Sequence, residues 1–222
     1  MYLQIIHLKF LSIFFVKTNK YFLLKKGKIM SKVSIVNKAL GYLGANRITS
    51  LSDGSFEAKC ASNYYNDSLR SVLSECGWKF ALDMVMLTKL DETPAWVEDG
   101  KENYFQLPPD LIEIFGIMDN TAIWERIGEK ILTNAKSFGI KYVYFCDDTT
   151  KYPQYFIDAF ACKLASDMCY DITNSNEKTM TLLELYKGEF LPIAKSKNAK
   201  AASRQQVEDS YWVNSVRGSI YG

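Results

Sequence analysis

The sequence has almost no histidine: its 222 residues include one, His7. Serine and cysteine nucleophiles in hydrolases usually take their general base from histidine, and many zinc sites use the same side chain. The zinc-protease pattern H-E-x-x-H, the nucleophile pattern G-x-S-x-G and a Walker-type glycine loop are also absent. The sequence therefore offers no catalytic, metal-binding or cofactor-binding residues, and we expect a protein that is not an enzyme and needs no cofactor.

Cysteine pairing is also absent from the pattern. The five cysteines are an odd number and form no C-x-x-C pair, which disfavours a disulfide framework and a zinc knuckle. Cys162 and Cys169 are seven residues apart and share one helical face, where we interpret them as small buried core residues. This cysteine usage is typical of a protein made in a reducing cytosol.

Residues 1–29 differ from the rest of the chain. They carry six of the 27 basic residues and no acidic residue, which leaves 21 basic against 25 acidic residues in the body, a formal charge of −4. Lysines interrupt the apolar run, the uncharged piece Phe10–Val16 is too short to span a bilayer, and no small-residue cleavage site is present after it. A basic helix on a membrane surface is one interpretation of this leader.

A misassigned start codon is the interpretation that we prefer. Lys25-Lys26-Gly27-Lys28 must be encoded by a purine-rich run, and such a run can contain a bacterial ribosome-binding sequence just upstream of Met30. We therefore expect translation to begin at Met30 and residues 1–29 to be an upstream extension, so that the working protein would contain no histidine. The intact mass of the protein made from its native gene would test this start.

Four segments of the body have helical periodicity. Ser34 can cap the first and Gly44 can end it, while Gly77 ends the second and places Trp78 at a seam. Pro192 is expected to kink or end the last one, whose apolar row is Met180, Leu183, Tyr186, Phe190 and Ile193. The four predicted helices span about residues 34–43, 55–76, 153–172 and 176–194.

Between the second and third helices the pattern favours strands. Phe80, Leu82, Met84 and Met86 alternate as in a strand, although part of this stretch also fits a helix. Three further segments are rich in β-branched and aromatic residues between turn formers, and a hairpin is expected at residues 127–130: the segments are NYFQL, LIEIFGI and GIKYVYF. The expected fold is α+β but mainly α, a helical bundle with a small β subdomain at about residues 78–146 inserted between helix pairs. Residues 30–194 would form this domain.

The C-terminal residues 195–222 have few aliphatic side chains and no sustained period, yet they contain Tyr211 and Trp212. A solvated tail would normally lack such a pair. We therefore expect an extended arm that docks on a partner through these two aromatic anchors, with Arg204 and Arg217 as polar clamps.

Two other functions are open at this point. The acidic pairs Asp91-Glu92, Glu98-Asp99 and Asp147-Asp148 could serve a carboxylate-based hydrolase if they converged in a pocket, although solvated loop charge is the commoner role. A DNA-binding accessory protein would need its scattered Lys and Arg residues to gather on one face.

The order of several segments resembles the tail tubular protein A family, the head-to-tail adaptors of short-tailed bacteriophages. The resemblance covers roughly residues 31–218, and its most specific pieces are L-G-x-x-x-I-T-S-L-x-D from Leu43, W-x-F-A with Trp78 and Phe80, and L-P-x-D with Pro108. The segments run SIVNKALGYLGANRITSLSDGSFEAKCASNYYNDSLRSVLSECGWKFA, YFQLPPDLIEIFGI, YFIDAFACKLASDMCYDIT and finally YWVNSVRG.

This resemblance implies a structural role. Such adaptors form a homo-oligomeric ring, typically twelve-fold, between the portal protein and the tail nozzle protein, and leave a channel for genomic DNA without sequence specificity. It implies a virion protein of the tail neck, made in the host cytoplasm and with no membrane partner. The C-terminal arm would then clasp the portal, and Trp78, Phe80 and Pro108 would hold the subunit in one shape.

Overall fold

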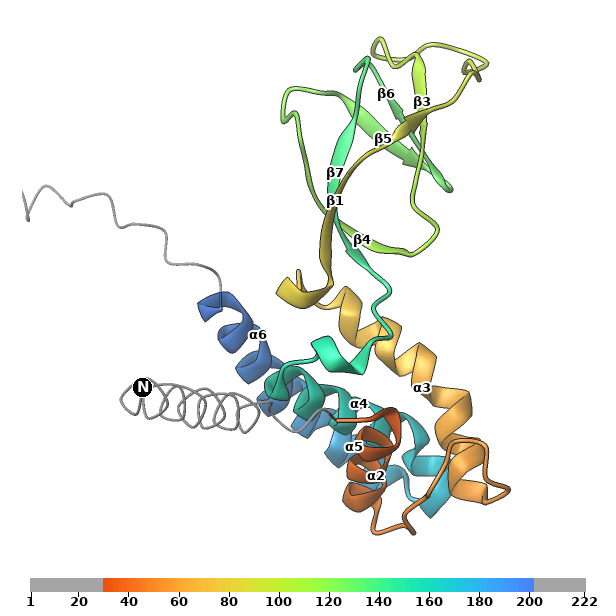
Figure 1. Ribbon diagram of the computed structural model, residues 1–222, viewed down its shortest axis with the longest axis vertical. Helices are drawn as coiled ribbons and strands as arrows, with labels where there is room; N and C mark the ends of the chain where they lie inside the picture. The colour runs from red at the N-terminus through yellow and green to blue at the C-terminus, as the bar shows by residue number, and fades with distance from the viewer. Residues whose placement is uncertain (1–29, 202–222) are drawn as a thin grey trace, which may run out of the picture.

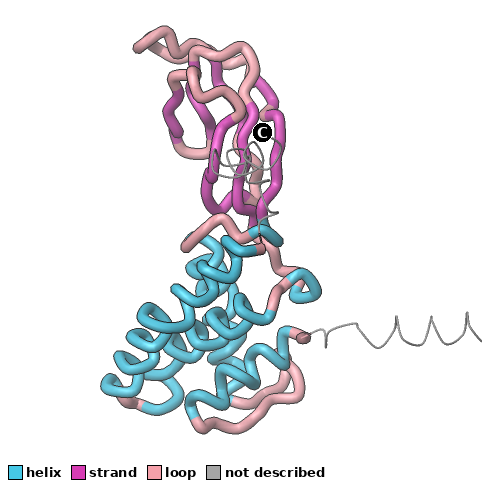
Figure 2. Tube along the Cα trace, turned by 90° about the vertical axis from the view of Figure 1, so that its left-hand side faces the viewer, coloured by secondary structure: helices cyan, strands magenta, loops and turns pink. Residues whose placement is uncertain are grey.

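The structure is a computed structural model that describes residues 30–201. The expected extension over residues 1–29 lies outside this range, as does most of the expected arm. Helices gather at one end of an elongated molecule and strands at the other (Figures 1 and 2). The helices are α2 Lys32–Leu43, α3 Phe56–Ser74, α4 Gln154–Thr173, α5 Asn176–Leu185 and α6 Leu191–Lys200. The strands are β1 Leu82–Met86, β2 Thr88–Lys89, β3 Asn103–Gln106, β4 Leu111–Ile117, β5 Trp124–Ile127, β6 Lys130–Thr133 and β7 Gly139–Tyr144.

The predicted fold class, a helical bundle with a small β insert, is wrong. Within residues 30–201, seven strands form two antiparallel sheets, β1-β7-β4 and β2-β3-β6-β5, and the fold is α+β with 20% of these residues in strands. The β part is more than an appendage because it has a hydrophobic core of its own, centred on Phe105, Ile131 and Phe138. Pairing between strands far apart in the sequence builds these sheets, and local periodicity does not reveal it.

Helix α4 is the centre of the helical part. Both of its long sides are apolar, and α2, α3 and α5 all pack against it. The first helix begins earlier than expected, because Ser31 rather than Ser34 is its cap: the Ser31 hydroxyl accepts a bond from the Ser34 backbone N–H at 3.2 Å. Gly44 ends α2 in the left-handed conformation, as its position in the sequence predicted.

The chain between α5 and α6 departs from the predicted helix. Residues 186–190 form a π-helical turn, and Pro192 lies in the first turn of α6, where a missing backbone N–H costs little. The helix therefore continues past the expected end at residue 194 and runs to Lys200. The turn also changes which residues face inward, since Leu191, Ala194 and Asn198 are buried while Ile193, expected in the apolar row, is 45% exposed.

Candidate interaction surface

The seam between the helical part and the β part is built around Trp78. Its side chain is fully buried, and its indole Nε1–H donates to the Val72 carbonyl at 2.7 Å, which ties the seam to the end of α3. The indole packs edge-on against Phe156 of α4, with ring centroids 5.0 Å apart. Phe80, which is half-buried, packs on the same Phe156 ring at 4.6 Å. Both predicted junction residues thus contact the central helix.

Gly77 brings the β part onto the seam from the other side. A Cβ atom at this position would lie 2.4 Å from Cε2 of the Phe115 ring, which belongs to β4. Only a residue without a side chain permits that approach. The aromatic ring of β4 therefore rests directly on the backbone at the end of α3.

Asn198 of α6 closes the seam. Its Oδ1 accepts a bond from the Lys79 N–H at 3.0 Å, and its Nδ2 donates to the Gly77 carbonyl at 3.0 Å. Asn198 is itself buried, so these two bonds satisfy polar groups that water does not reach. The end of α6 is consequently fixed beside the chain that leads into β1.

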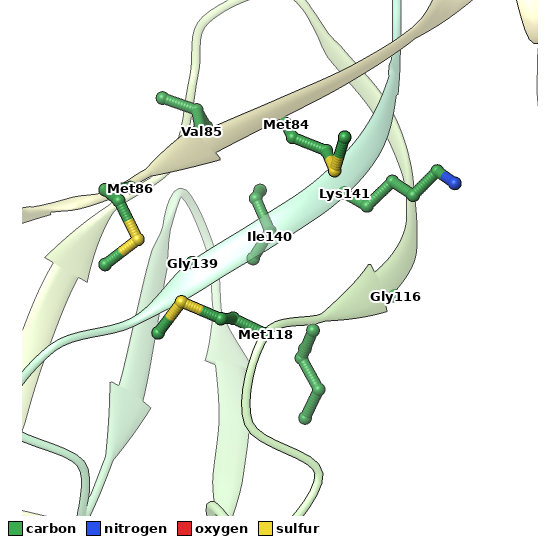
Figure 3. Close-up of a pocket in the computed structure, with 9 residues that line it drawn as sticks. Met84, Val85, Met86, Gly116, Met118, Gly139, Ile140 and Lys141 are labelled. Carbon is green, nitrogen blue, oxygen red and sulfur yellow. The ribbon is translucent and has the colours of Figure 1, made fainter.

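The outer face of the sheet β1-β7-β4 is apolar and exposed. In the antiparallel register Met84 lies opposite Lys141 and Met86 opposite Gly139, so these four residues share one face. The other face carries Ile140 and Tyr142, which are buried in the core of the β part. Figure 3 shows the methionines gathered along β1 and β7.

A groove of about 340 Å³ runs across this outer face. We call it the methionine groove; it is formed by Met84, Met86 and Met118 around Gly139. A Cβ atom on Gly139 would lie 2.8 Å from the Met86 sulfur and 3.4 Å from the Met118 sulfur. The backbone of Gly139, which has no side chain, therefore forms the floor of the groove (Figure 3). Met84 is 75% exposed. Flexible, polarisable methionines on an open surface are typical of adaptable binding sites.

A second apolar surface lies beside the sheet β2-β3-β6-β5. Trp96 is 74% exposed, and Ile123, Trp124 and Ile127 of the β5 region are also exposed. Of the fourteen large hydrophobic residues that are exposed in residues 30–201, ten lie between Met84 and Ile127. The unpartnered apolar surface of the described chain is therefore concentrated in the β part.

Pro108 lies in the turn that joins β3 to β4. The Pro108 carbonyl accepts a hydrogen bond from the Leu111 N–H at 3.2 Å. In the same turn, the Asp110 carbonyl accepts one from the Phe145 N–H at 2.7 Å. This turn thereby links the start of β4 to the end of β7. The remaining predicted site residues, Arg204, Tyr211, Trp212 and Arg217, lie outside the described residues.

Three carboxylates of the acidic pairs have partners in the structure. Glu92 pairs with Lys130, Asp147 pairs with Lys32, and Asp148 caps a 3-10 turn by accepting the Thr150 N–H at 3.0 Å. Within residues 30–201 no three His, Cys, Asp or Glu side chains are grouped so as to hold a metal ion. Six lysines of the described chain form ion pairs with carboxylates, and they are spread over both parts: Lys32, Lys38, Lys101, Lys130, Lys163 and Lys195.

Sequence reasoning did not identify the methionine groove. Met84 and Met86 were visible as an alternating pattern, but exposure of their face depends on which strands pair and on what covers the sheet. The nearest signal in the sequence was Gly139, a glycine that begins a strand of otherwise bulky residues, which is typical of a close approach by neighbouring side chains.

Comparison with known proteins adds no assignment. A scan against protein-family models and a search of curated proteins both returned no match for this chain. No helix in the described part of the chain is long and apolar enough to span a membrane.

Proposed function

We propose that this protein is a structural subunit of a bacteriophage virion, a head-to-tail adaptor whose copies form a ring between the portal and the tail nozzle. The observation that carries the proposal is the exposed apolar surface of the β part, with the methionine groove on one sheet and Trp96 beside the other. Exposed apolar surface on this scale marks sites of association. Two different surfaces on one subunit suit a head-to-tail interface, which closes into a ring when the rotation permits.

The segments that carry the family resemblance support the proposal through their positions. In L-G-x-x-x-I-T-S-L-x-D, both the N–H and the carbonyl of Ile48 bond to the Asn37 side chain at 2.8 Å, which fixes the loop after α2. In W-x-F-A, Trp78 forms the seam, and in L-P-x-D, the Asp110 carbonyl links β4 to β7. Each segment holds the subunit's shape, which is what a ring under the pressure of a packaged genome requires of its parts.

Charge is consistent with a DNA conduit. The body carries a formal charge of −4, and many of its lysines are already paired with carboxylates. A channel lining without strong positive potential does not retain passing phosphates. The proposed contact with DNA is therefore passage without sequence recognition.

The test is assembly with a portal. Purified full-length protein is mixed with the portal protein encoded in the same genome, and rings are scored by sedimentation and electron microscopy. The matched variants are Tyr211→Ala/Trp212→Ala in the arm and Tyr170→Ala, an exposed tyrosine on α4. Anchor residues commonly contribute about 2 kcal/mol or more each, so each lost anchor should weaken binding by about 30-fold.

The outcomes separate two parts of the proposal. Rings on the portal with full-length protein and with Tyr170→Ala, but not with the double variant, support both the adaptor and its arm. Undiminished binding of the double variant removes the arm from the interface. Failure of full-length protein to form any complex with the portal overturns the adaptor function itself.

A further inference from the structure

We infer that in the isolated subunit the methionine groove is occupied by the chain's own C-terminal segment, with Tyr211 and Trp212 seated on the methionines. This goes beyond the proposed function because it concerns the free subunit: the segment would have to leave the groove before the groove or the aromatic pair could take part in a ring. Four observations support it: the chemistry of the groove, the place where the described chain ends, the length of the C-terminal segment, and the charges on both sides.

The groove suits aromatic side chains. Three thioethers surround a glycine floor, and the volume of about 340 Å³ falls within the range of sites that bury compact ligands. Sulfur contacts with aromatic rings are favourable, at about 0.3 to 1.5 kcal/mol each. Tyr211 and Trp212 are the adjacent aromatic pair in the 21 residues that come after Ala201.

The described chain ends at the foot of β1, the strand that lines the groove. Asn198, in the last turn of α6, is bonded to the Lys79 backbone at 3.0 Å, and Lys79 precedes the start of β1 by three residues. Strand β1 then leads to Met84 and Met86, and as the outer strand of its sheet it has one open edge. The C-terminal segment thus leaves the described structure at the foot of the strand that lines the groove.

The segment is long enough to reach the groove. Tyr211 comes ten residues after Ala201, and ten residues can span up to about 33 Å, whereas the five residues of β1 extend over about 17 Å. A short tether gives an effective concentration in the millimolar range. The chain's own segment therefore outcompetes a second copy at the micromolar concentrations of ordinary solutions.

Opposite charges on the segment and on the groove face favour one chain direction for the segment along β1. Glu208 and Asp209 precede Tyr211 by three and two residues, and Lys141 lies in the face that lines the groove. The Lys141 ammonium lies 5.7 Å from the centroid of the Phe115 ring, so it stands above the sheet at the side nearest the seam. An incoming chain would pass its two acids by Lys141 before its aromatic residues reach Met86.

Site-specific photo-cross-linking of the full-length chain tests this inference. A benzophenone amino acid replaces Met84, whose high exposure lets it change without disturbing the core, or Met180, a matched control that is 56% exposed on α5. Trypsin then releases residues 205–217, which lie between two arginine cleavage sites and contain the aromatic pair. We expect cross-links from position 84 to this peptide in species of monomer mass, and at least tenfold fewer from position 180.

A charge variant provides a second measurement. Lys141→Glu should reduce the cross-link yield from position 84 several-fold, while Lys187→Glu, an exposed lysine of the helical part, should leave it unchanged. Three results would overturn the inference: cross-links from position 84 only between two chains, which would assign the groove to a second copy; cross-links only to residues 1–29; or equal yields from positions 84 and 180.

Discussion

Replacing Gly77 by alanine probes how the β part rests on the helical part. The new Cβ would lie 2.4, 2.6 and 2.7 Å from three atoms of the Phe115 ring, so that ring must move. Overpacking of this kind costs about 1 to 3 kcal/mol. Phe115 is about half exposed and can swing outward, so we expect a loss of about 1 to 2 kcal/mol in the free energy of unfolding.

Removing the Phe115 ring tests whether that ring causes the loss. In a Phe115→Ala background the alanine at position 77 meets no ring, and its remaining effect is to restrict the unfolded chain, which stabilises a protein by about 0.4 to 1 kcal/mol where the backbone angles are compatible. Gly77→Ala should therefore change sign between the two backgrounds. The original protein, the two single variants and the double variant form a double-mutant cycle, and their free energies of unfolding are compared by urea unfolding monitored by circular dichroism.

Gly41→Ala is the matched control. Gly41 lies inside α2 with no atom within 4 Å of the added Cβ, so this change should stabilise the protein by about 0.5 to 1 kcal/mol with or without Phe115. If Gly77→Ala has the same effect in both backgrounds, within about 0.5 kcal/mol, the contact between Phe115 and Gly77 is not what holds the two parts together.

Three further predictions concern stability. Trp78→Ala should lower the free energy of unfolding by about 3 to 5 kcal/mol because the side chain is fully buried. Trp96→Ala, at an exposed site, should change it by less than about 0.5 kcal/mol. A loss below about 1 kcal/mol at Trp78 would contradict our account of the seam. Ending the chain after residue 194 should lower stability by about 2 kcal/mol relative to ending it after residue 201, because only the shorter chain loses the two Asn198 bonds to the seam; equal unfolding midpoints would refute this. Hydrogen bonds from Ser55 hold the pKa of Asp53 below its usual value, so its contribution is present above about pH 4 and is lost as the pH falls through the lowered pKa; Asp53→Asn should flatten that part of an acid titration of stability, and an unchanged profile would count against it.

The sequence was most informative where apolar spacing and turn residues agreed. Helix α3 was expected at 55–76 and lies at Phe56–Ser74, and the hairpin around Gly128 forms with this glycine at a positive φ. Ser31 and Ser34 could not be distinguished as caps, because either can accept a bond at the start of the same apolar row. Strand β2 is two residues long and depends on its pairing with β3, so no local pattern marks it.

The candidate surface was less accessible to sequence reasoning. Trp78 was recognisable because a glycine and an aromatic residue come directly after a regular helix. The face that carries Met84 and Met86 is exposed because no other described element packs over it, and which face of a sheet stays uncovered is a long-range property. Asn198 is hard to recognise for another reason: it lies in a stretch where lysine and alanine dominate, a composition that favours a solvated arm.

The π-helical turn at residues 186–190 determines which side chains of α6 face inward. An inserted residue turns the rest of a helix by about 100°. Without it, the row through Leu182 and Tyr186 would continue inward at Phe190 and Ile193; with it, the buried positions become Leu191, Ala194 and Asn198. Removing one residue from this turn would thus rotate α6 about its own axis. Asn198 would then point away from Gly77, although the amino-acid sequence of α6 would be unchanged.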